Sequence, residues 1–299
     1  MKDFKDSVAV VTGGASGLGF ALAKAAQARG AKLVIADIRE DALEAAEAEL
    51  SGGGDVMTFR VDVSKGEELQ ALADATIEHF GKVNMLFNNA GIFASGLTWE
   101  TSEEEYDWVI GVNQRSVFNG IRSFVPLMLK QNDPCHVITV SSGAGITVNP
   151  GFCTYSMTKH AVVGLTEALY LDLQAQGAEN IGVTIVMPGM SQSGIMSPEK
   201  TTPNALQKEV GNRKSNNILK ALETVMQAGV DAGLPADELA EIVFQAIERD
   251  DLYVLPAFMD EGNQAFAAAV AMGRATGQNN YPPFTEAFLQ TLKEIEQAG

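Results

Sequence analysis

A tyrosine and a lysine lie four residues apart in the run from Thr154 to Lys159, and Ser142 lies thirteen residues before the tyrosine. Residues i and i+4 share one face of a helix, so the Tyr155 phenol and the Lys159 ammonium can reach a common site. One charge at about 4 Å contributes roughly 4 kcal/mol at an effective dielectric of about 20. We therefore expect Lys159 to lower the pKa of Tyr155 and prepare it for general acid–base catalysis. Taken alone, the pair is more typical of an ordinary helix without chemistry.

A glycine-rich segment near the N-terminus supplies the second half of the argument. The apolar run 7–11 predicts a buried strand, Thr12 to Gly19 predicts a turn, and the alanine-rich run 20–29 predicts a helix. Glycines in this context let a backbone approach a pyrophosphate at the positive end of a helix. A second predicted strand, 32–36, ends at Asp37, whose carboxylate can accept hydrogen bonds from ribose hydroxyls. Together these elements predict a dinucleotide site.

The chain resembles the short-chain dehydrogenase/reductase family over about residues 5 to 255. The matching elements, in the family's order, are Thr12-Gly13-x-x-x-Gly17-x-Gly19, Asp62-Val63, Asn88-Asn89-Ala90-Gly91, Asn113, Ser142, Tyr155-x-x-x-Lys159 and Pro188-Gly189. The spacing of these matches makes the resemblance specific. Asn84 is a departure, because aspartate often stands there, and we expect it to affect stability more than chemistry.

The resemblance implies a catalytic tetrad of Asn113, Ser142, Tyr155 and Lys159. Tyr155 is the implied general base in alcohol oxidation and the general acid in the reverse direction. Lys159 is implied to bind the nicotinamide ribose, and Ser142 to hold the substrate oxygen, with Ser141 as its competitor. Asn113 matches an asparagine that supports a water-linked proton relay to the lysine, the alternative being a helix kink without chemistry.

The cofactor is expected to contact residues from the whole carboxyl edge of the sheet. The predicted contacts are Gly13, Ser16, Gly17, Leu18, Gly19, Asp37, Ile38, Asp62, Val63, Asn89, Ala90, Gly91, Tyr155, Lys159, Pro188, Gly189, Ser191 and Ser193. The resemblance places Asp62 and Val63 beside the adenine. Asn89 is expected near the adenosine ribose, with a structural role in tying strands together as a compatible alternative. Ser193 stands where the family usually has threonine and keeps the hydroxyl for the nicotinamide carboxamide.

The choice between NAD and NADP depends on electrostatics. The Asp37 carboxylate would repel the 2′-phosphate of NADP, and Ser16 is neutral where NADP-preferring relatives often carry a basic residue. Arg39 is the contrary signal, and we expect its side chain to point to solvent or to stack on the adenine. NAD is therefore the expected cofactor, NADP is less favoured, and oxidation is the expected working direction. A reductase that uses NADPH is the alternative within the family.

Composition narrows the class of protein further. The chain has 299 residues, a formal net charge of −17 and a sequence pI of about 4.5, without a basic stripe for nucleic acid. The N-terminus shows no signal peptide and no apolar run approaches the ~20 residues of a membrane helix. The two cysteines, Cys135 and Cys153, fit a reducing cytoplasm. The three histidines lack metal-ligand spacing, so we expect no metal. From the acidic charge and the absence of a long apolar run we also expect no nucleic-acid or membrane partner.

The alternation of strand and helix patterns predicts an α/β fold, a Rossmann-like doubly wound parallel sheet of seven strands with helices on both faces. Strands are expected near 7–12, 32–36, 56–61, 84–88, 135–140, 181–187 and 251–255. Helices are expected near 17–29, 40–50, 65–80, 102–131, 154–176 and 235–248. One domain would cover 1–256, with residues 189–234 as a substrate lid that has helical potential around 215–228. A helical extension, 257–299, would carry helices near 261–272 and 284–297.

The expected substrate pocket is mainly apolar. Its predicted residues are Ser142, Phe93, Phe152, Met190 and Met196, with Ile92, Ala94, Ala144, Gly145 and Val148 as further candidates. No arginine or lysine is placed to clamp a carboxylate or phosphate, which favours a hydrophobic secondary alcohol or its ketone, in an alcohol dehydrogenase acting on CH–OH donors. The start of the chain, the lid and the tail are similar to a subgroup that oxidises benzylic alcohols of lignin-derived aryl ethers. Steroid-like and terpenoid alcohols are alternatives.

Two alternative functional classes and the oligomeric state can also be assessed from the sequence. A nucleotide-binding member with a sensing or scaffold role should lack part of the tetrad, and a Rossmann-like methyltransferase would not need Ser142, Tyr155 and Lys159 in register. The long helices carry apolar positions expected to be exposed, namely Phe118, Ile121, Phe124, Leu165, Leu169 and Leu173. Because such helices pair in relatives, we expect a homodimer or homotetramer, the alternative being that these residues pack on the sheet.

Overall fold

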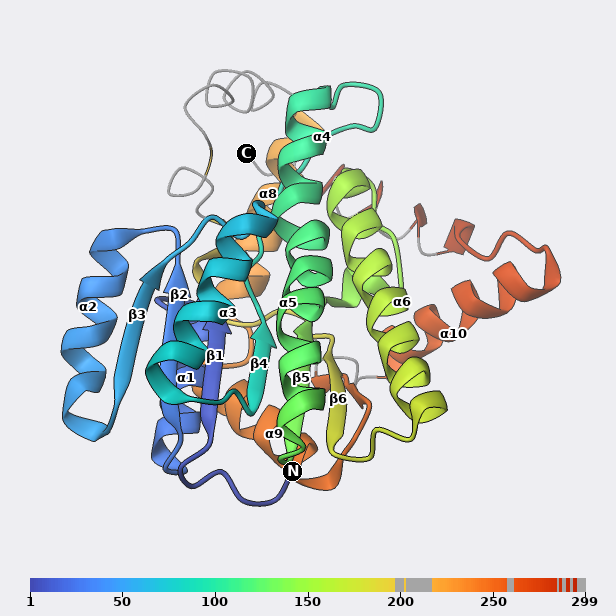
Figure 1. Cartoon of the computed structure of the whole chain (residues 1–299). Helices are drawn as coiled ribbons and strands as arrows, with labels where there is room; N and C mark the ends of the chain where they lie inside the picture. Colours follow the sequence, from blue (N-terminus) through green and yellow to red (C-terminus); the bar gives the residue numbers. More distant parts are fainter. Residues whose placement is uncertain are drawn as a thin grey trace.

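The computed structural model describes residues 1–196, 202, 217–256, 261–283, 285–286, 289–290 and 293–294. Its centre is a seven-stranded parallel sheet with the strand order β3-β2-β1-β4-β5-β6-β7 (Figure 1). The chain builds outward from β1 to β3, returns to β4 beside β1, and then builds outward on the other side. This reversal of strand order opens a crevice at the carboxyl ends of β1 and β4, where ligands bind in open α/β sheets. The predicted Rossmann-like fold is confirmed.

The strands are short, and all but the edge strands β3 and β7 are almost wholly buried, because helices cover both faces of a parallel sheet. Their bounds are β1 Val8–Thr12, β2 Lys32–Asp37, β3 Val56–Arg60, β4 Met85–Asn88, β5 Cys135–Val140, β6 Ile181–Val186 and β7 Tyr253–Val254. In β1, Ala9 and Val11 join one hydrophobic core while Val8 and Val10 join a second core. Successive side chains of a strand point to opposite faces, so one apolar run supplies both cores.

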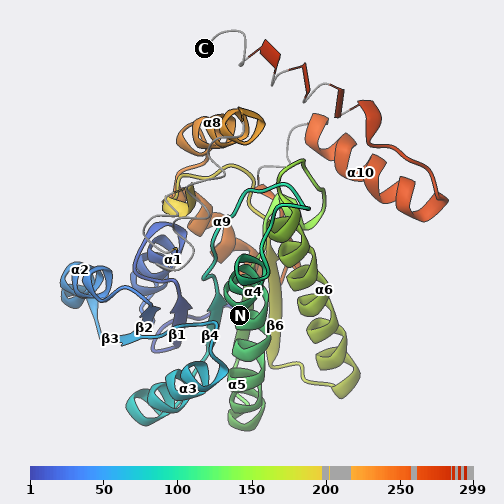
Figure 2. The same cartoon turned by 90° about the horizontal axis from the view of Figure 1, so that it is seen from above.

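The helices form a layer on each side of the sheet (Figure 2). Helices α1 (Gly17–Ala28), α2 (Glu40–Leu50) and α9 (Ala236–Arg249) pack on one face. Helices α3 (Gly66–Phe80), α5 (Ser116–Gln131) and α6 (Cys153–Gln176) pack on the other. Helix α4 (Glu103–Ile110) leads into α5 through a π-helical turn, Gly111–Arg115, so the single helix expected over 102–131 is interrupted. Short 3-10 turns cover Ser51–Gly53, Gly143–Gly145 and Gly194–Met196.

Three of the six apolar positions expected to be exposed on the long helices are buried instead. Phe124 of α5 and Leu169 and Leu173 of α6 belong to the core beneath these helices. Their expected exposure was wrong, because the spacing of these residues places them on the helix faces that meet the sheet. Phe118, in contrast, is 51% exposed.

Two helices lie outside the sheet layers. Helix α8 (Asn217–Asp231) lies above the carboxyl end of the sheet, at the position predicted for the lid helix (Figure 2). The rest of the predicted lid at 197–201 and 203–216 falls outside the described residues, as does most of the tail helix predicted at 284–297. Helix α10 (Glu261–Thr276) projects beyond α6, where Arg274 lies 3.3 Å from a ring nitrogen of His160. Among the described helices, none combines the length and apolar character needed to span a membrane.

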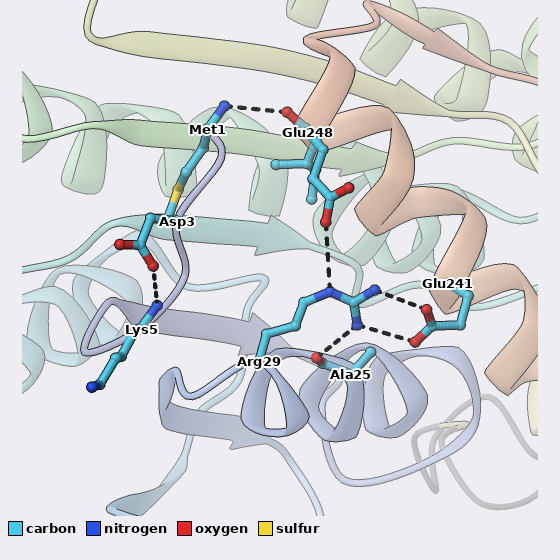
Figure 3. A network of polar contacts seen from close by, with 8 residues as sticks. Met1, Asp3, Lys5, Ala25, Arg29, Glu241 and Glu248 are labelled. Carbon is cyan, nitrogen blue, oxygen red and sulfur yellow. Dashed lines mark hydrogen bonds and ion pairs between the residues drawn. The ribbon is translucent and has the colours of Figure 1, made fainter.

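An arginine links α1 to α9 at the edge of the first helix layer (Figure 3). Arg29 caps the end of α1 and donates two hydrogen bonds to the Glu241 carboxylate, at 3.0 and 2.8 Å. Its Nε lies 4.0 Å from Glu248, and its guanidinium lies 4.5 Å from the centre of the Phe244 ring. The hydrogen bonds to Glu241 raise the pKa of Arg29, and the same contact lowers the pKa of Glu241. These contacts hold the two helices together at the C-terminal end of α1, opposite the glycine turn.

Candidate active site

The glycine turn between β1 and α1 has the geometry of a pyrophosphate cradle. Gly13 and Gly17 have φ values of 61° and 54°, in the left-handed region that favours glycine. A Cβ on Gly19 would overlap the carbonyl oxygen of Gly13, so this position also requires glycine. The turn ends at the N-terminus of α1, whose free backbone N–H groups and positive dipole suit an anion.

Asp37 closes β2 beside this turn, but it is not a bare carboxylate. It is buried, and it accepts hydrogen bonds from the backbone N–H groups of Ala15 at 3.3 Å and Arg39 at 3.2 Å. Nε of Arg39 lies 3.8 Å from Asp37 Oδ1. Arg39 is therefore directed toward Asp37 and does not simply point to solvent, while its stacking on an adenine stays a prediction. The carboxylate attracts the guanidinium, which partly neutralises the negative charge at the end of β2.

The segments after β3 and β4 bring further predicted cofactor residues to this edge. Asn89 donates from its side-chain amide to the carbonyl oxygens of Thr12 at 2.9 Å and Gly13 at 3.2 Å. It thus ties β4 to the glycine turn, which is the structural role considered for it. Asp62 accepts from both the backbone N–H and the hydroxyl of Ser64, at 3.0 and 2.7 Å. Val63, beside it, is buried.

Asn84 has the structural role expected of this departure from the family pattern. Its side-chain oxygen accepts from the Val8 backbone N–H at 3.0 Å, and its amide donates to the Pro134 carbonyl at 3.2 Å. It therefore holds the starts of β1, β4 and β5 together, at the end of the sheet opposite the glycine turn.

The segment that follows β6 reaches both the glycine turn and the serine loop. The Pro188 carbonyl accepts from the Gly143 N–H at 3.0 Å. A Cβ on Gly17 would lie 3.6 Å from Cβ of Ser193, so Ser193 faces the turn. Ser191 forms a parallel bridge with Leu234, which fixes the segment against the start of α9. The motif predicted to meet the nicotinamide carboxamide therefore lies across the crevice from α1.

Tyr155 and Lys159 project from the first turns of α6 into the same buried site. Their residues are 7% and 3% exposed. The Lys159 ammonium donates to the Val140 carbonyl at 3.1 Å and lies 5.6 Å from the centre of the Tyr155 ring. The helix spacing that predicted a shared site is thus confirmed in three dimensions.

Asn113 lies in the π-helical turn between α4 and α5. Its side-chain oxygen accepts from the Ile92 N–H at 2.8 Å, and its amide donates to the Ile92 carbonyl at 2.9 Å. A Cβ on Gly91 would lie 3.4 Å from Lys159 Nζ and 3.5 Å from Asn113 Oδ1, so the two side chains converge on Gly91. The helix is distorted at Asn113, as the alternative of a kink predicted, and Asn113 also adjoins Lys159, so the water-linked proton relay stays a prediction.

The two serines of the loop after β5 have different partners. The Ser141 hydroxyl is buried and donates to the Lys159 carbonyl of α6 at 2.9 Å. The Ser142 hydroxyl accepts from the Ala144 N–H at 3.2 Å and hydrogen-bonds the Tyr155 side chain. The geometry thus favours Ser142 over its competitor as the serine beside the phenol.

Burial dominates the electrostatics of the pair. Burial raises the pKa of Tyr155, and the hydrogen bond with Ser142 opposes this effect. Burial also lowers the pKa of Lys159 to about 8. The expectation that Lys159 lowers the Tyr155 pKa is therefore not met in the protein alone, because the ammonium binds the Val140 carbonyl and neither charged form is well solvated.

An apolar cluster surrounds the phenol. The rings of Phe93, Phe152 and Tyr155 meet edge to face, with centroid distances of 5.0 to 6.3 Å. Ala144 and Leu222 complete the buried cluster, and Ile195, Met196 and Met226 pack against it. Leu222 and Met226 come from α8 and were missed in the sequence, where their helical spacing did not reveal which surface α8 covers.

Met190, unlike the other four principal predicted pocket residues, lies apart from this cluster. It is 39% exposed, and a Cβ on Gly229 would lie 3.1 Å from its sulfur. Its carbonyl accepts from the Leu234 N–H at 3.0 Å, which directs the segment toward α9. The structure therefore brings together four of the principal predicted pocket residues, Ser142, Phe93, Phe152 and Met196, with the further candidate Ala144.

A separate cavity of about 410 Å³ opens at the opposite end of the sheet, lined in part by Cys135, Gly182 and Asp250. Its lining shares no residue with the Tyr155 cluster. Nearby, burial lowers the pKa of His136 to about 3, so this imidazole is neutral at physiological pH. This cavity lies at the amino ends of β5 and β6, away from the Tyr155 cluster. Within the described part of the chain, no cluster of three or more His, Cys, Asp or Glu side chains is placed to hold a metal ion.

Comparisons with known proteins agree with this geometry. The family model described as short chain dehydrogenase matches residues 7–204. A C alpha-dehydrogenase from Sphingobium sp. is 35% identical over 258 residues, covering 86% of this chain and 82% of that protein. A CLA biosynthesis dehydrogenase/reductase from Lactiplantibacillus plantarum is 32% identical over 256 residues, covering 85% of this chain and 89% of the relative.

A solved structure supports the same assignment. The crystal structure of a short chain dehydrogenase/reductase from Burkholderia phymatum, in complex with NAD, superposes with a TM-score of 0.86 at 38% identity. The match covers 94% of this chain and 98% of that one. Family model, relatives and fold agree, and the chain therefore belongs to the short-chain dehydrogenase/reductase family of oxidoreductases.

Proposed function

We propose that the protein is an NAD-dependent alcohol dehydrogenase that interconverts a hydrophobic secondary alcohol and its ketone. The observation that carries this proposal is the buried Tyr155 phenol, which hydrogen-bonds Ser142 inside an aromatic cluster at the carboxyl edge of the sheet. A cluster of this kind excludes water and leaves two hydroxyl groups to hold one substrate oxygen. The glycine turn lies at the same edge, on the far side of Gly91.

Tyr155 is the proposed general base in oxidation. Its phenolate would take the hydroxyl proton of the alcohol, and the phenol would return a proton to the ketone oxygen in reduction. Ser142 would hold that oxygen and stabilise the charge that develops on it. Because burial raises the Tyr155 pKa in the protein alone, a positive charge beside the phenol is needed to form the phenolate near neutral pH. Lys159 alone does not lower this pKa, so the nicotinamide ring of the oxidised cofactor would have to supply the further positive charge.

Asn113 and Lys159 are proposed to support proton movement at this site. Their side chains converge on Gly91, and among the described residues the Lys159 ammonium donates to one acceptor, the Val140 carbonyl. An ammonium has three donors, so Lys159 can also hold a ribose hydroxyl and the end of a water chain that begins at Asn113. Asn113 further fixes the Ile92 backbone, which positions the neighbouring Phe93 in the pocket.

The residues at the carboxyl edge fit a nicotinamide dinucleotide. Gly13, Gly17 and Gly19 would admit the pyrophosphate, Asp37 would accept from the ribose hydroxyls, and Ser193 would bind the carboxamide. A bound dinucleotide of this type supplies the hydride acceptor for oxidation and the hydride donor for reduction. We propose NAD over NADP because Asp37 is buried at the ribose position. The neighbouring Arg39 guanidinium reduces this preference.

The aromatic cluster favours an aryl-bearing substrate. Phe93 and Phe152 present ring edges and faces beside Tyr155, which suits an aromatic ring next to the reacting carbon. The similarity to the C alpha-dehydrogenase from Sphingobium supports benzylic alcohols of aryl ethers as the first class to test. Steroid-like and terpenoid alcohols are the competing classes.

The direct test is NADH or NADPH formation at mildly alkaline pH with a panel of secondary alcohols, comparing benzylic aryl ethers, cyclic alcohols and steroids. Activity with NAD on one class supports the proposal and names the substrate type. Bound NADH, detected by its fluorescence, together with silence across the panel would count against the dehydrogenase proposal and favour a sensing or scaffold role.

Tyr155→Phe tests the proposed base. We expect the variant to lose at least about a thousandfold in kcat, because no other group in the cluster can take the proton. NADH binding should change little, since the ring and its packing remain. Tyr253→Phe is the matched control, because the Tyr253 phenol is exposed and hydrogen-bonds Glu167 at 2.7 Å. Substantial turnover in Tyr155→Phe would refute the mechanism.

A further inference from the structure

A carboxylate from α8 lies at the edge of the aromatic cluster. Glu223 follows Leu222, which is buried against Phe93 and Phe152, and precedes Met226, which packs on the same cluster. The Ser95 hydroxyl donates to Glu223 Oε1 at 2.9 Å. Ser95 follows Phe93 by two residues in the segment after β4, so the contact joins the two sides of the proposed substrate cleft.

The Glu223 carboxylate lies next to the apolar surface of the Tyr155 cluster and has acceptor positions beyond the one that Ser95 occupies. An ionised carboxylate has about four acceptor positions, and Ser95 occupies one of them. Within the described part of the chain, no basic group lies within ion-pair distance of Glu223, and Lys220, one helical turn earlier, is exposed. A partly buried carboxylate with no countercation among the described residues attracts hydrogen-bond donors and repels anions.

We propose that Glu223, positioned by Ser95, determines substrate specificity. It accepts a hydrogen bond from a second hydroxyl group on the substrate, remote from the carbon that is oxidised, and it repels substrates that carry a carboxylate or phosphate. The preferred class is therefore a neutral, hydrophobic secondary alcohol with an additional alcohol or phenol group. This inference rests on the proposed dehydrogenase function and narrows its substrate.

The contact explains why α8 carries an acidic residue at the edge of its apolar face. Leu222 and Met226 supply the surface that covers the cluster, and a third apolar residue beside them would enlarge it. Glutamate at this position interrupts the apolar surface, and its hydroxyl partner among the described residues, Ser95, lies on the opposite side of the proposed cleft. A substrate hydroxyl that enters between the two sides meets both Glu223 and Ser95 as partners.

The test uses three secondary aryl alcohols of one skeleton whose ring carries a hydroxymethyl, a methyl or a carboxylate group. Glu223→Leu removes the acceptor, and we expect the preference in kcat/KM for hydroxymethyl over methyl to fall about tenfold or more. Glu223→Gln removes the charge, and we expect kcat/KM for the carboxylate substrate to rise about fivefold or more relative to the methyl substrate. Asp231→Asn is the control on the same helix, because Asp231 is exposed and accepts from Gln227 at 2.8 Å.

Ratios between substrates separate specificity from folding, because a general loss of structure lowers all three values together. Ser95→Ala should keep the discrimination against the carboxylate substrate, since the charge remains, while weakening the hydroxymethyl preference. Unchanged ratios in Glu223→Leu and Glu223→Gln, with an active enzyme, would overturn this inference and leave the dehydrogenase function intact. Absence of turnover with all three substrates and with the wider alcohol panel would overturn both.

Discussion

At the level of single residues, burial controls the acid–base chemistry of the site. Lys159 is held as a buried cation whose pKa falls to about 8, and burial moves the Tyr155 pKa upward. At neutral pH both groups keep the protonation state of an isolated side chain, since Tyr155 is a neutral phenol and Lys159 is mainly an ammonium. Burial nevertheless destabilises the Lys159 cation, and this cost should appear in the stability of the fold.

Lys159→Met should stabilise the free protein near neutral pH. The difference between the ordinary pKa of 10.5 and about 8 corresponds to at most about 3 kcal/mol of destabilisation by the buried charge. Between these values the unfolded state binds more protons, so wild type gains stability as pH rises from 8 to 10.5. The stabilisation of the variant should therefore be largest at pH 7 and shrink over that interval. Denaturant unfolding of both proteins at several pH values measures it, and a constant difference would contradict the prediction.

Asp37→Ser should shift the cofactor preference toward NADP. The change removes the carboxylate at the ribose position and releases the Arg39 guanidinium, 3.8 Å away in the structure, to meet a 2′-phosphate. We expect the ratio of kcat/KM with NADP to that with NAD to rise about tenfold or more. Asp41→Asn, an exposed change in the first turn of α2, should leave the ratio unaltered. A ratio that stays at the wild-type value in Asp37→Ser would show that Asp37 does not select the cofactor.

At the level of elements, the site residues are positioned mainly by contacts between segments that lie far apart in the chain. The π-helical turn between α4 and α5 presents Asn113 to Ile92, and α8 covers Phe93 and Tyr155 with residues far along the chain. Helix α1 begins at the glycine turn, and at its other end Arg29 spans to α9.

Arg29 and Glu241 should show a modest pairwise coupling in a double-mutant cycle with Arg29→Met and Glu241→Gln. We expect about 0.5–1 kcal/mol in the free energy of unfolding, because Glu241 is largely exposed and water screens the pair. Arg29 lowers the pKa of Glu241 from its ordinary 4.5, so the coupling should be complete above that pH and disappear as pH falls through the lowered value. Equilibrium unfolding at pH 7 and in acid measures it. A coupling that is equal at both pH values would exclude an ionic origin.

At the level of the whole molecule, the outer faces of α5 and α6 expose large apolar side chains. Phe118 of α5 is 51% exposed and Leu171 of α6 is 64% exposed. The two helices lie side by side on one face of the sheet (Figure 1). Exposed apolar residues on adjacent helices are typical of surfaces that pair with another copy. A homodimer or homotetramer stays our prediction for this face.

Phe118→Glu should lower the mass of the assembly in solution. If α5 and α6 pair with the same helices of another copy, the new carboxylate would be buried in the apolar interface without a partner. This burial would weaken association by several kcal/mol. Light scattering coupled to size exclusion measures the mass. Trp99→Glu is the control, because Trp99 is exposed but precedes α4 and lies outside the α5 and α6 faces. A monomeric wild type, or an equal effect of both variants, would contradict the prediction.

The sequence by itself determined the strand and helix order, the glycine turn, and the convergence of Tyr155 and Lys159. These features follow from local rules, because alternation, glycine geometry and the i+4 spacing act over a few residues. Only the tertiary structure decided which side chains meet across the crevice. It turned Met190 toward Gly229, paired Arg39 with Asp37, and buried Phe124.

The same distinction governs the electrostatics and the lid. The pKa of Tyr155 depends on what covers the phenol, and Leu222 of α8 reaches it from a segment more than sixty residues away in the chain. In the sequence Glu223 is an ordinary helical glutamate. Only the tertiary structure shows that its carboxylate accepts a hydrogen bond from Ser95, in the segment after β4. Burial and long-range contacts depend on how all elements pack, so the spacing of residues along the chain cannot determine them.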